Sequence, residues 1–321
     1  MAEGYRSRVR AIVTGGAGFI GSHLVERLLT DGAEVLVLDD LSSGDAANLA
    51  GATGPMTLET VDAGSDAARA IIAGFGPDLV YHLAAQPSVV VSVRDPMLDA
   101  RINVMALLSV LEASAGSGAR KVVFSSSGGT VYGDPDPSAL PVPETYVGLP
   151  SSPYGITKRV AHDYLAFYNR VHAIEFTALA LSNVYGPRQD PHGEAGVVAI
   201  WSQKMLAGEE CVVFGDGEQT RDFVYVADVV DAFARAAEAG DGEIVNVGTG
   251  VQTSVNELYR TMAASLGVNA QPRRDDARPG ELRHIALDVS KAASVLGWKP
   301  ETSLADGIAT TTAWFSRQAR G

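Results

Sequence analysis

The glycine-rich segment TGGAGFIG, which begins at Thr14, constrains the fold of this chain more than any other stretch. It follows an apolar run, Val9 to Thr14, that predicts a buried strand, and it precedes an amphipathic stretch, Phe19 to Leu29, that predicts a helix. Because glycine has no β-carbon, the turn can be tight and the helix N-terminus can receive a diphosphate on free N–H groups. The glycines at this spacing are Gly15, Gly18 and Gly21. Gly16 adds an overlapping GxGxxG pattern, so the string alone leaves the register open.

The first half of the chain continues with apolar runs that alternate with amphipathic stretches. Further strands are predicted at Glu34–Asp40, Met56–Asp62, Asp78–Ala84, Lys121–Ser127 and Glu175–Leu181. The clearest helical patterns are Asp95–Ala113 and Pro153–Val171. Alternating strands and helices imply a parallel sheet with both faces covered. We therefore predict an α/β fold of the Rossmann type, with a doubly wound parallel sheet.

The regular alternation of strand and helix patterns ends at Asn183. A Pro/Gly-rich loop, YGPRQDPHGEAG, begins at Tyr185. Shorter elements follow, and they predict a smaller, mixed α/β substrate domain. The segment VYVADVVDAF, which begins at Val224, looks able to pack back onto the first domain. The predicted division is residues 1–183 with about 224–250 for the cofactor domain, and 184–223 with 251–321 for the substrate domain. A ligand cleft between the two is expected.

Composition narrows the classes of partner. The formal charge is −13 without any block of lysine or arginine, which argues against nucleic acid or an anionic membrane as the main partner. Cys211 is the only cysteine, so an internal disulfide is impossible and a reducing compartment is favoured. The sequence has no apolar run of about 18 residues, and its polar start lacks the apolar core of a signal peptide. These features predict a cytoplasmic protein.

Asp39 closes the second predicted strand, where a carboxylate can accept both ribose hydroxyls of an adenosine. It would repel a 2′-phosphate, and the residues that follow include no arginine to attract one. The cofactor that this pattern favours is NAD rather than NADP.

Tyr154 and Lys158 stand four residues apart in SSPYGITK. A phenol with the ordinary pKa of about 10 is a poor base at neutral pH. A lysine one helical turn away lies on the same face and stabilises the phenolate, and an oxidised nicotinamide ring acts in the same direction. With the glycine turn upstream, the pair predicts hydride chemistry in which the tyrosine is the general base.

Three serines follow a predicted strand in FSSSGGTVYG, at the carboxyl edge where ligands bind to open α/β sheets. A hydroxyl at this edge can hydrogen-bond the substrate oxygen that Tyr154 deprotonates. For Ser125 and Ser126, a purely structural role in a turn remains an equal alternative.

The combined motifs resemble the extended short-chain dehydrogenase/reductase superfamily and, within it, bacterial UDP-galactose (UDP-glucose) 4-epimerases. The likeness runs along almost the whole chain through TGGAGFIGSHL, VLDDLSSG, VYHLAAQ, SSSGGTVYG, SPYGITK, NVYGPRQDPHGEAG, VVFGDGEQTRDFVYVADV and RPGELR. It implies NAD-dependent epimerisation of a UDP-hexose at C4 through a 4-keto intermediate, in a homodimer built on the two long helices. Neither nucleic acid, a membrane nor a metal ion is expected as a partner.

The resemblance also implies roles for individual positions. Tyr154 would be the general acid and base, Lys158 its partner and Ser127 the orienting hydroxyl. The implied NAD contacts, besides Tyr154 and Lys158, are Gly15, Gly18, Phe19, Ile20, Gly21, Asp39, Asp40, Ser43, Gly44, Asp62, Ala63, Leu83, Ala84, Ala85, Gln86 and Asn103. The implied substrate contacts are Ser127, Asn183, Val212, Phe214, Arg221, Arg278 and Ile285, with the two arginines on the diphosphate. An ion pair with Asp222 or Asp228 is the alternative for Arg221.

Two departures from the family pattern affect these roles. The serine segment carries an extra residue at Gly128–Gly129, so Ser127 and Thr130 compete for the hydroxyl role, and we prefer Ser127 because it continues the strand. Ile285 falls where many members carry a gating residue beside the sugar. An aliphatic side chain there leaves room for an N-acetyl group, which predicts some turnover of UDP-N-acetylhexosamines.

Other activities of the superfamily need residues that can be compared with those in this sequence. A 4,6-dehydratase or a decarboxylase usually has acidic groups where Gly128–Gly129 stand. A UDP-glucuronate 4-epimerase needs a cation for the carboxylate, which Arg188, Arg273 or Arg283 could supply. A non-catalytic NAD sensor would need the glycine turn but neither Tyr154 nor Lys158.

Overall fold

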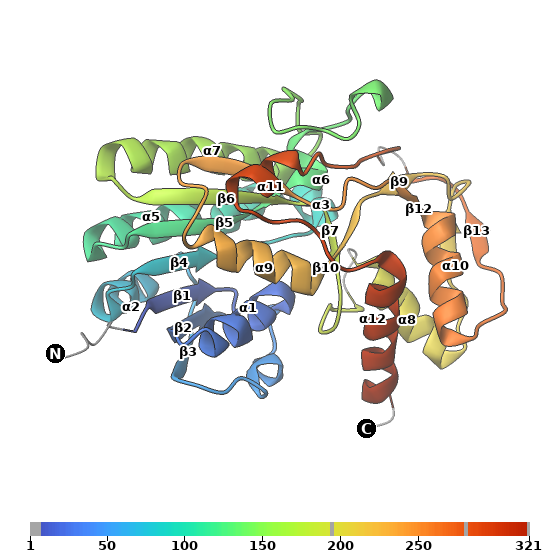
Figure 1. The fold of residues 1–321 in the computed structure, drawn as a ribbon, viewed down its shortest axis with the longest axis horizontal. Helices are drawn as coiled ribbons and strands as arrows, with labels where there is room; N and C mark the ends of the chain where they lie inside the picture. Colours follow the sequence, from blue (N-terminus) through green and yellow to red (C-terminus); the bar gives the residue numbers. More distant parts are fainter. Residues whose placement is uncertain (1–7, 193–195, 279–281, 320–321) are drawn as a thin grey trace.

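The structure is a computed structural model that describes residues 8–192, 196–278 and 282–319 (Figure 1). Its centre is a seven-stranded sheet in the order β11-β6-β5-β4-β1-β2-β3, in which all neighbours are parallel. The strands are β1 (Arg10–Thr14), β2 (Glu34–Asp39), β3 (Met56–Thr60), β4 (Leu79–His82), β5 (Lys121–Ser127), β6 (Glu175–Leu181) and β11 (Glu243–Val247). This is the Rossmann order with one more strand at the edge, so the predicted fold class is confirmed.

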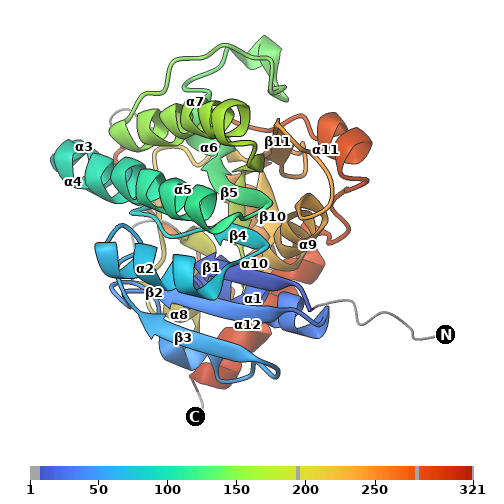
Figure 2. The same cartoon turned by 90° about the vertical axis from the view of Figure 1, so that its left-hand side faces the viewer.

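Helices cover both faces of the sheet, as Figure 2 shows. On one face lie α2 (Asp66–Phe75), α5 (Ala106–Ser117) and α7 (Pro153–His172), and on the other lie α1 (Phe19–Thr30) and α9 (Val226–Ala236). Successive strand residues point to opposite faces. Accordingly, Ile12 packs into the cluster with α5 and α7, while Ala11 and Val13 pack into the cluster with α1 and α9. Because both faces are covered, the central strands carry consecutive apolar residues, as in AIV of β1 and VLVL of β2.

A smaller part of the chain lies to the right of the sheet in Figure 1. It contains α8 (Val197–Ala207), α10 (Val255–Leu266), α12 (Leu304–Gln318) and the short parallel pair β8 (Val212–Phe214) and β13 (Arg273–Asp275). These elements enclose their own apolar cluster around Trp201, Tyr259 and Met262. The two-domain division remains our proposal, and the separate cluster supports it.

Short elements connect these layers. There are two further strand pairs: β7 (Asn183–Tyr185) is parallel to β10 (Phe223–Tyr225), and β9 (Thr220–Arg221) is antiparallel to β12 (Thr253–Ser254). The remaining helical pieces are η1 (Ala46–Leu49), α3 (Val89–Arg94), α4 (Pro96–Ala100), η2 (Arg101–Met105), α6 (Gly128–Val131), η3 (Pro137–Ala139) and α11 (Ser290–Val295).

The predicted helix Asp95–Ala113 differs in one respect from the structure. It begins as α4, passes through the π-helical turn η2 and continues as α5. A π turn widens the helix by one residue, and such turns are frequent at functional sites. Here the side chain of Asn103 within the turn hydrogen-bonds the backbone of Gln86, in the loop after β4.

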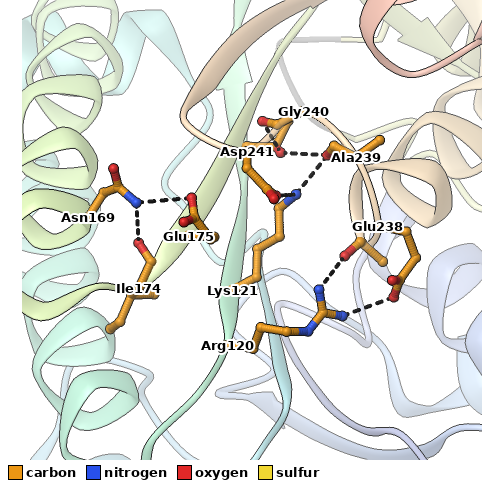
Figure 3. A network of polar contacts seen from close by, with 11 residues as sticks. Arg120, Lys121, Asn169, Ile174, Glu175, Glu238, Ala239, Gly240 and Asp241 are labelled. Atoms are coloured by element: carbon orange, nitrogen blue, oxygen red, sulfur yellow. Dashed lines mark hydrogen bonds and ion pairs between the residues drawn. The ribbon is translucent and has the colours of Figure 1, made fainter.

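A polar network joins the loop that precedes β11 to the start of β5 (Figure 3). Lys121, the first residue of β5, is fully buried, and its ammonium donates to the Ala239 carbonyl at 2.7 Å and to Asp241 at 2.5 Å. The neighbouring Arg120 donates to Glu238 at 2.9 Å. A buried ammonium without partners is costly, so these contacts fix where the segment after α9 returns to the sheet.

Candidate active site

A cleft of about 1650 Å³ opens at the carboxyl ends of the parallel strands. The β1–α1 turn, the ends of β2, β4 and β5 and the segment after β6 line it, and α8 and α12 form its outer wall. The predicted residues on its lining are Gly15, Gly18, Phe19, Ile20, Gly21, Asp39, Asp40, Ser43, Gly44, Asp62, Ala63, Leu83, Ala84, Ala85, Gln86, Ser127, Tyr154, Lys158 and Asn183. Asn103 lies behind this lining and reaches the cleft through Gln86.

At Gly15 and Gly21, the turn between β1 and α1 has no room for a side chain. Gly15 has a φ of +70°, and a β-carbon on it would lie 2.7 Å from the Ala84 nitrogen. A β-carbon on Gly21 would lie 2.1 Å from the Gly15 carbonyl oxygen. Gly16 instead faces Val37 of β2. The register Gly15, Gly18 and Gly21 is therefore the one that lines the cleft. Gly18 caps α1 without a side-chain hydrogen bond, which leaves the first N–H groups of the helix available to a diphosphate.

Asp39 ends β2 at the far side of this turn and is buried. Its two carboxylate oxygens accept hydrogen bonds from the backbone nitrogens of Ala17 and Leu41, each at 2.9 Å. A carboxylate has about four acceptor positions, so the pair of ribose hydroxyls finds positions that these backbone bonds leave open. The glycine cradle and this fixed carboxylate fit an adenine dinucleotide without a 2′-phosphate. The exposed Asp40 instead accepts from Ser42.

Tyr154 and Lys158 occupy the first turns of α7 and both line the cleft. Pro153 at the first helical position and the Ser152 cap, which accepts from the Gly155 nitrogen, fix where this helix begins. The Lys158 ammonium is buried and donates to the Ser125 carbonyl at 2.9 Å. It lies 5.8 Å from the centre of the Tyr154 ring, so the end of β5 holds the lysine beside the phenol.

The electrostatics of the pair follow from burial. Burial raises the pKa of Tyr154 to about 12, while a hydrogen bond with the Ser127 side chain opposes the rise. Burial lowers the pKa of Lys158 to about 8, and the charge of Asp99 opposes the fall. Without ligands the phenol is therefore protonated at neutral pH, and additional positive charge beside it is needed to make it a base.

The serines at the end of β5 divide their tasks. Ser127 lines the cleft and lowers the pKa of Tyr154 against the larger effect of burial, whereas the Thr130 hydroxyl donates to the Ser127 carbonyl at 3.4 Å and is not part of the lining. Ser126 pairs with His162 at 2.7 Å, and Ser125 holds Lys158 with its carbonyl. Gly128 begins α6, and a β-carbon on it would lie 2.4 Å from Leu287 Cδ1. This geometry favours Ser127 as the orienting hydroxyl, which stays a prediction.

The other predicted substrate residues lie beyond the lining of the cleft. Val212 and Phe214 belong to β8, and the Arg278 guanidinium stacks 4.0 Å from the centre of the Phe214 ring. Arg221 belongs to β9. Ile285 is 2% exposed and packs with an apolar cluster that includes Tyr132 and Leu287. Their roles remain predictions.

Asp222 and Asp228, the alternative partners of Arg221, accept hydrogen bonds from other segments of the chain. Asp222 is fully buried and accepts from the backbone of Thr249 and Leu287, and Asp228 accepts from Thr302. Both carboxylates thus hold loops of the protein in place.

Sequence reasoning missed Arg101 and Gln189 of the cleft wall, and it named Arg188 only as a possible partner of a glucuronate carboxylate. Arg101 of the π turn is exposed on the lining, and Gln189 lines it with a carbonyl oxygen that is buried without a partner. Arg188 has a positive φ of 68° and pairs with Glu26 of α1 at 2.6 Å. Non-glycine residues at positive φ concentrate at functional sites, but the sequence carries no sign of that conformation.

The fold and this site place the chain among the short-chain dehydrogenases/reductases. Within that superfamily it belongs to the NAD dependent epimerase/dehydratase family, whose model matches residues 11–248.

Full-length relatives and solved structures narrow the likeness further. The chain is 48% identical over 315 residues to UDP-glucose 4-epimerase of Mycolicibacterium smegmatis, covering 97% of this chain and 100% of the relative. The structure of Thermotoga maritima UDP-glucose 4-epimerase with UDP-glucose matches with a TM-score of 0.93 and 44% identity over 97% of this chain and 100% of that one. The Thermus thermophilus UDP-glucose 4-epimerase complex with NAD matches with a TM-score of 0.89 and 39% identity over 96% and 99%.

In the described ranges, no helix combines the length and apolar character needed to cross a membrane. The same ranges contain no group of three side chains arranged to hold a metal ion.

Proposed function

We propose that this protein interconverts UDP-galactose and UDP-glucose by NAD-dependent epimerisation at C4. The observation that carries the proposal is the meeting of Tyr154, Lys158 and Ser127 at the end of β5, inside a cleft whose glycine turn fits a dinucleotide. The relatives named above are UDP-glucose 4-epimerases over their full length, which supports the choice of reaction.

The chain's own residues supply binding and proton transfer. Bound NAD would accept hydride from C4 and return it to the opposite face of the sugar. Tyr154 takes the proton of the 4-hydroxyl and later gives it back, and Ser127 orients that oxygen. Lys158 and the positively charged oxidised ring offset the high pKa that burial gives Tyr154. Because no net oxidation occurs, the same cofactor molecule serves successive turnovers.

The nucleotide half of the substrate would lie across the cleft from the cofactor. Asn183 stands on the cleft wall at the start of β7. We assign the diphosphate to Arg221 and Arg278, because guanidinium groups bind phosphate oxygens in a bidentate manner. Phe214, already stacked with Arg278, is assigned to the base.

The cations needed for a glucuronate carboxylate are committed elsewhere. Arg188 pairs with Glu26, Arg273 with Glu210 and Arg283 with Asp216. This favours a neutral hexose over glucuronate. Gly128 and Gly129 form the start of α6 and bring no acidic group to the end of β5, which argues against dehydration and decarboxylation.

The decisive assay is conversion of UDP-galactose to UDP-glucose by the purified protein, first without added NAD and then with it. We expect product in equilibrium with substrate and no change of mass. A product of lower mass would indicate elimination or loss of carbon dioxide. Binding of NAD without any conversion would favour a sensor. UDP-N-acetylglucosamine in the same assay tests whether Ile285 leaves room for the N-acetyl group.

We also infer a homodimer in the cytoplasm, the latter from the single buried cysteine. The helices α3, α4 and α7 and the turn η2 expose large apolar side chains, namely Val89, Val90, Val93, Met97, Met105, Ile156, Phe167 and Val171. An apolar surface of this kind suits a twofold interface.

The variant Val93→Glu/Phe167→Glu is expected to be a monomer, because both changes place charge on this surface. Light scattering after size-exclusion chromatography measures the mass. Val251→Glu, at an exposed valine outside these helices, should leave the dimer intact. A monomeric wild-type protein, or a double variant that still dimerises, would contradict the proposed interface.

A further inference from the structure

One buried carboxylate lies beneath the proposed catalytic pair without touching the cleft. Asp99 ends the first turn of α4 and is 0% exposed. One of its oxygens accepts from Gln86 Nε2 at 3.0 Å and from Asn103 Nδ2 at 2.9 Å. The other accepts from Thr157 Oγ1 at 3.0 Å. A fully buried carboxylate is costly unless it is hydrogen-bonded and faces a positive charge.

The partners of Asp99 belong to three different elements of the site. Gln86 lies in the cleft after β4, Asn103 lies in the π turn, and Thr157 lies in α7 between Tyr154 and Lys158. The π turn matters here because it carries Asn103 from α4 toward both Asp99 and Gln86. A single carboxylate thus joins the cofactor side of the cleft to the helix that carries the base.

Lys158 is the positive charge on which this carboxylate acts. Thr157, which donates to Asp99 at 3.0 Å, directly precedes Lys158 in α7, and the charge of Asp99 raises the pKa of Lys158 against the larger effect of burial. The titratable groups around the ammonium are Tyr154 and His162 on α7, His82 on β4 and Asp99 on α4. Burial lowers the pKa of His82 to about 3 and that of His162 to about 4, so both rings are neutral at pH 7. Among the described residues, Asp99 is the carboxylate whose charge acts on Lys158.

We propose that Asp99 is a positioning residue of the catalytic pair: its carboxylate provides the counter-charge of the Lys158 ammonium and fixes α7 relative to the cofactor loop. The inference deepens the function proposed above and rests on it for the meaning of activity measurements. The charge interaction between Asp99 and Lys158 does not depend on the proposed function, because it concerns the folded protein alone.

Asp99→Asn separates the charge from the hydrogen bonds. The amide oxygen of the new side chain can still accept from Gln86 and Asn103. Its nitrogen can donate to Thr157 Oγ1, which already lies 2.9 Å from the Tyr154 carbonyl and can donate there. The matched control is Thr157→Val, which removes one hydrogen bond to Asp99 and keeps the negative charge.

The first readout is the pH profile of turnover. Removing a negative charge lowers the pKa values of both Tyr154 and Lys158, since Asp99 raises both. Both limbs of the profile of Asp99→Asn should therefore move to lower pH, by about half a unit or more. The profile of Thr157→Val should keep its position, whatever its height. A profile of Asp99→Asn that is lower but unmoved would overturn the proposal.

The second readout needs no turnover. In the wild-type protein the folded-state pKa of Lys158, about 8, lies below its unfolded value, and without Asp99 it falls further. Below the folded-state pKa of Lys158 in both proteins, the lysine is charged, and Asp99→Asn should be less stable than the wild type by the full charge interaction. As the pH rises above about 8, Lys158 loses its charge and this difference in stability disappears. Urea midpoints at pH 6.5 and 9.5, measured with saturating NAD, should show a large loss at the lower pH and little at the higher. A loss equal at both pH values contradicts the charge role.

A double variant keeps the test decisive should Asp99→Asn fold poorly. Asp99→Asn/Lys158→Met removes both charges, so it should be more resistant to urea at pH 6.5 than Asp99→Asn alone. A double variant that gains nothing overturns the pairing. If the stability pattern holds in a protein that converts no UDP-galactose, the charge pair stands and the proposed function fails.

Discussion

Replacing Tyr154 by phenylalanine is expected to reduce the rate of UDP-galactose conversion by about 10³-fold while leaving bound NAD in place. Loss of a general acid–base group typically costs 10²- to 10⁴-fold. The ring remains, so the contact with the Lys158 ammonium remains, and the lysine keeps its bond to the Ser125 carbonyl. Cofactor binding should persist because the glycine turn and Asp39 are untouched. Product chromatography measures the rate, and NAD released on denaturation measures occupancy.

Tyr164→Phe is the matched control, since it removes a phenolic hydroxyl from the same helix at a position outside the cleft lining. Its conversion rate should equal that of the wild-type protein. A Tyr154→Phe protein that works at a near-normal rate would remove this phenol from the mechanism, and Ser127 would then be the first group to reconsider. Loss of NAD from the variant would instead show that the phenol contributes to binding.

Gly21→Ala is expected to weaken NAD binding at least tenfold and to lower the free energy of unfolding by about 1–3 kcal/mol. The new β-carbon would lie 2.1 Å from the Gly15 carbonyl oxygen and 2.8 Å from the Gly16 α-carbon. Both are backbone atoms, so the turn itself must move. Because that turn presents the N–H groups for the diphosphate, its displacement affects the cofactor before it affects the rest of the fold.

Gly116→Ala makes the same substitution within a helix, in α5, with nothing within 4 Å of the added carbon. It should bind NAD normally and be equally stable or more stable by about 0.5–1 kcal/mol. Fluorescence titration with NAD and urea denaturation measure both quantities. Equal behaviour of the two alanine variants would mean that the turn tolerates a side chain and that the cradle is wider than its geometry implies.

Apolar periodicity was sufficient where a strand is buried on both faces. The predicted strands Lys121–Ser127 and Glu175–Leu181 have the bounds of β5 and β6. The placement of Tyr154 and Lys158 on one helix followed from their spacing, and their place in the cleft followed from their combination with the glycine turn upstream. The rule that ligands bind at the carboxyl ends of parallel strands placed Ser127 there. These conclusions depend on local patterns alone.

Contacts between distant segments could not be read in this way. The apolar pattern of residues 95–113 did not reveal the π turn. Such a turn adds one residue to a helix that continues on either side of it, so the sequence still reads as one helix. Asp99 looks like an ordinary surface acid until Gln86 and Thr157 are brought to it. The pairing of Arg188 with Glu26 likewise needs the loop after β7 to return to α1. These contacts were not predicted because tertiary structure, rather than local sequence, decides the partners of such groups.

The polar network around Lys121 limits where this chain can be cut into fragments that fold. The outermost strand of the central sheet, β11, follows α8 and β8 in the sequence, and Asp241 pairs with Lys121 at the start of β5. A fragment cut after residue 183 would leave the hydrogen-bonding edge of β6 bare and an interior ammonium without its counterion. The chain thus leaves the central sheet after β6 and returns to it at β11, so a single cut cannot separate this sheet from the smaller part.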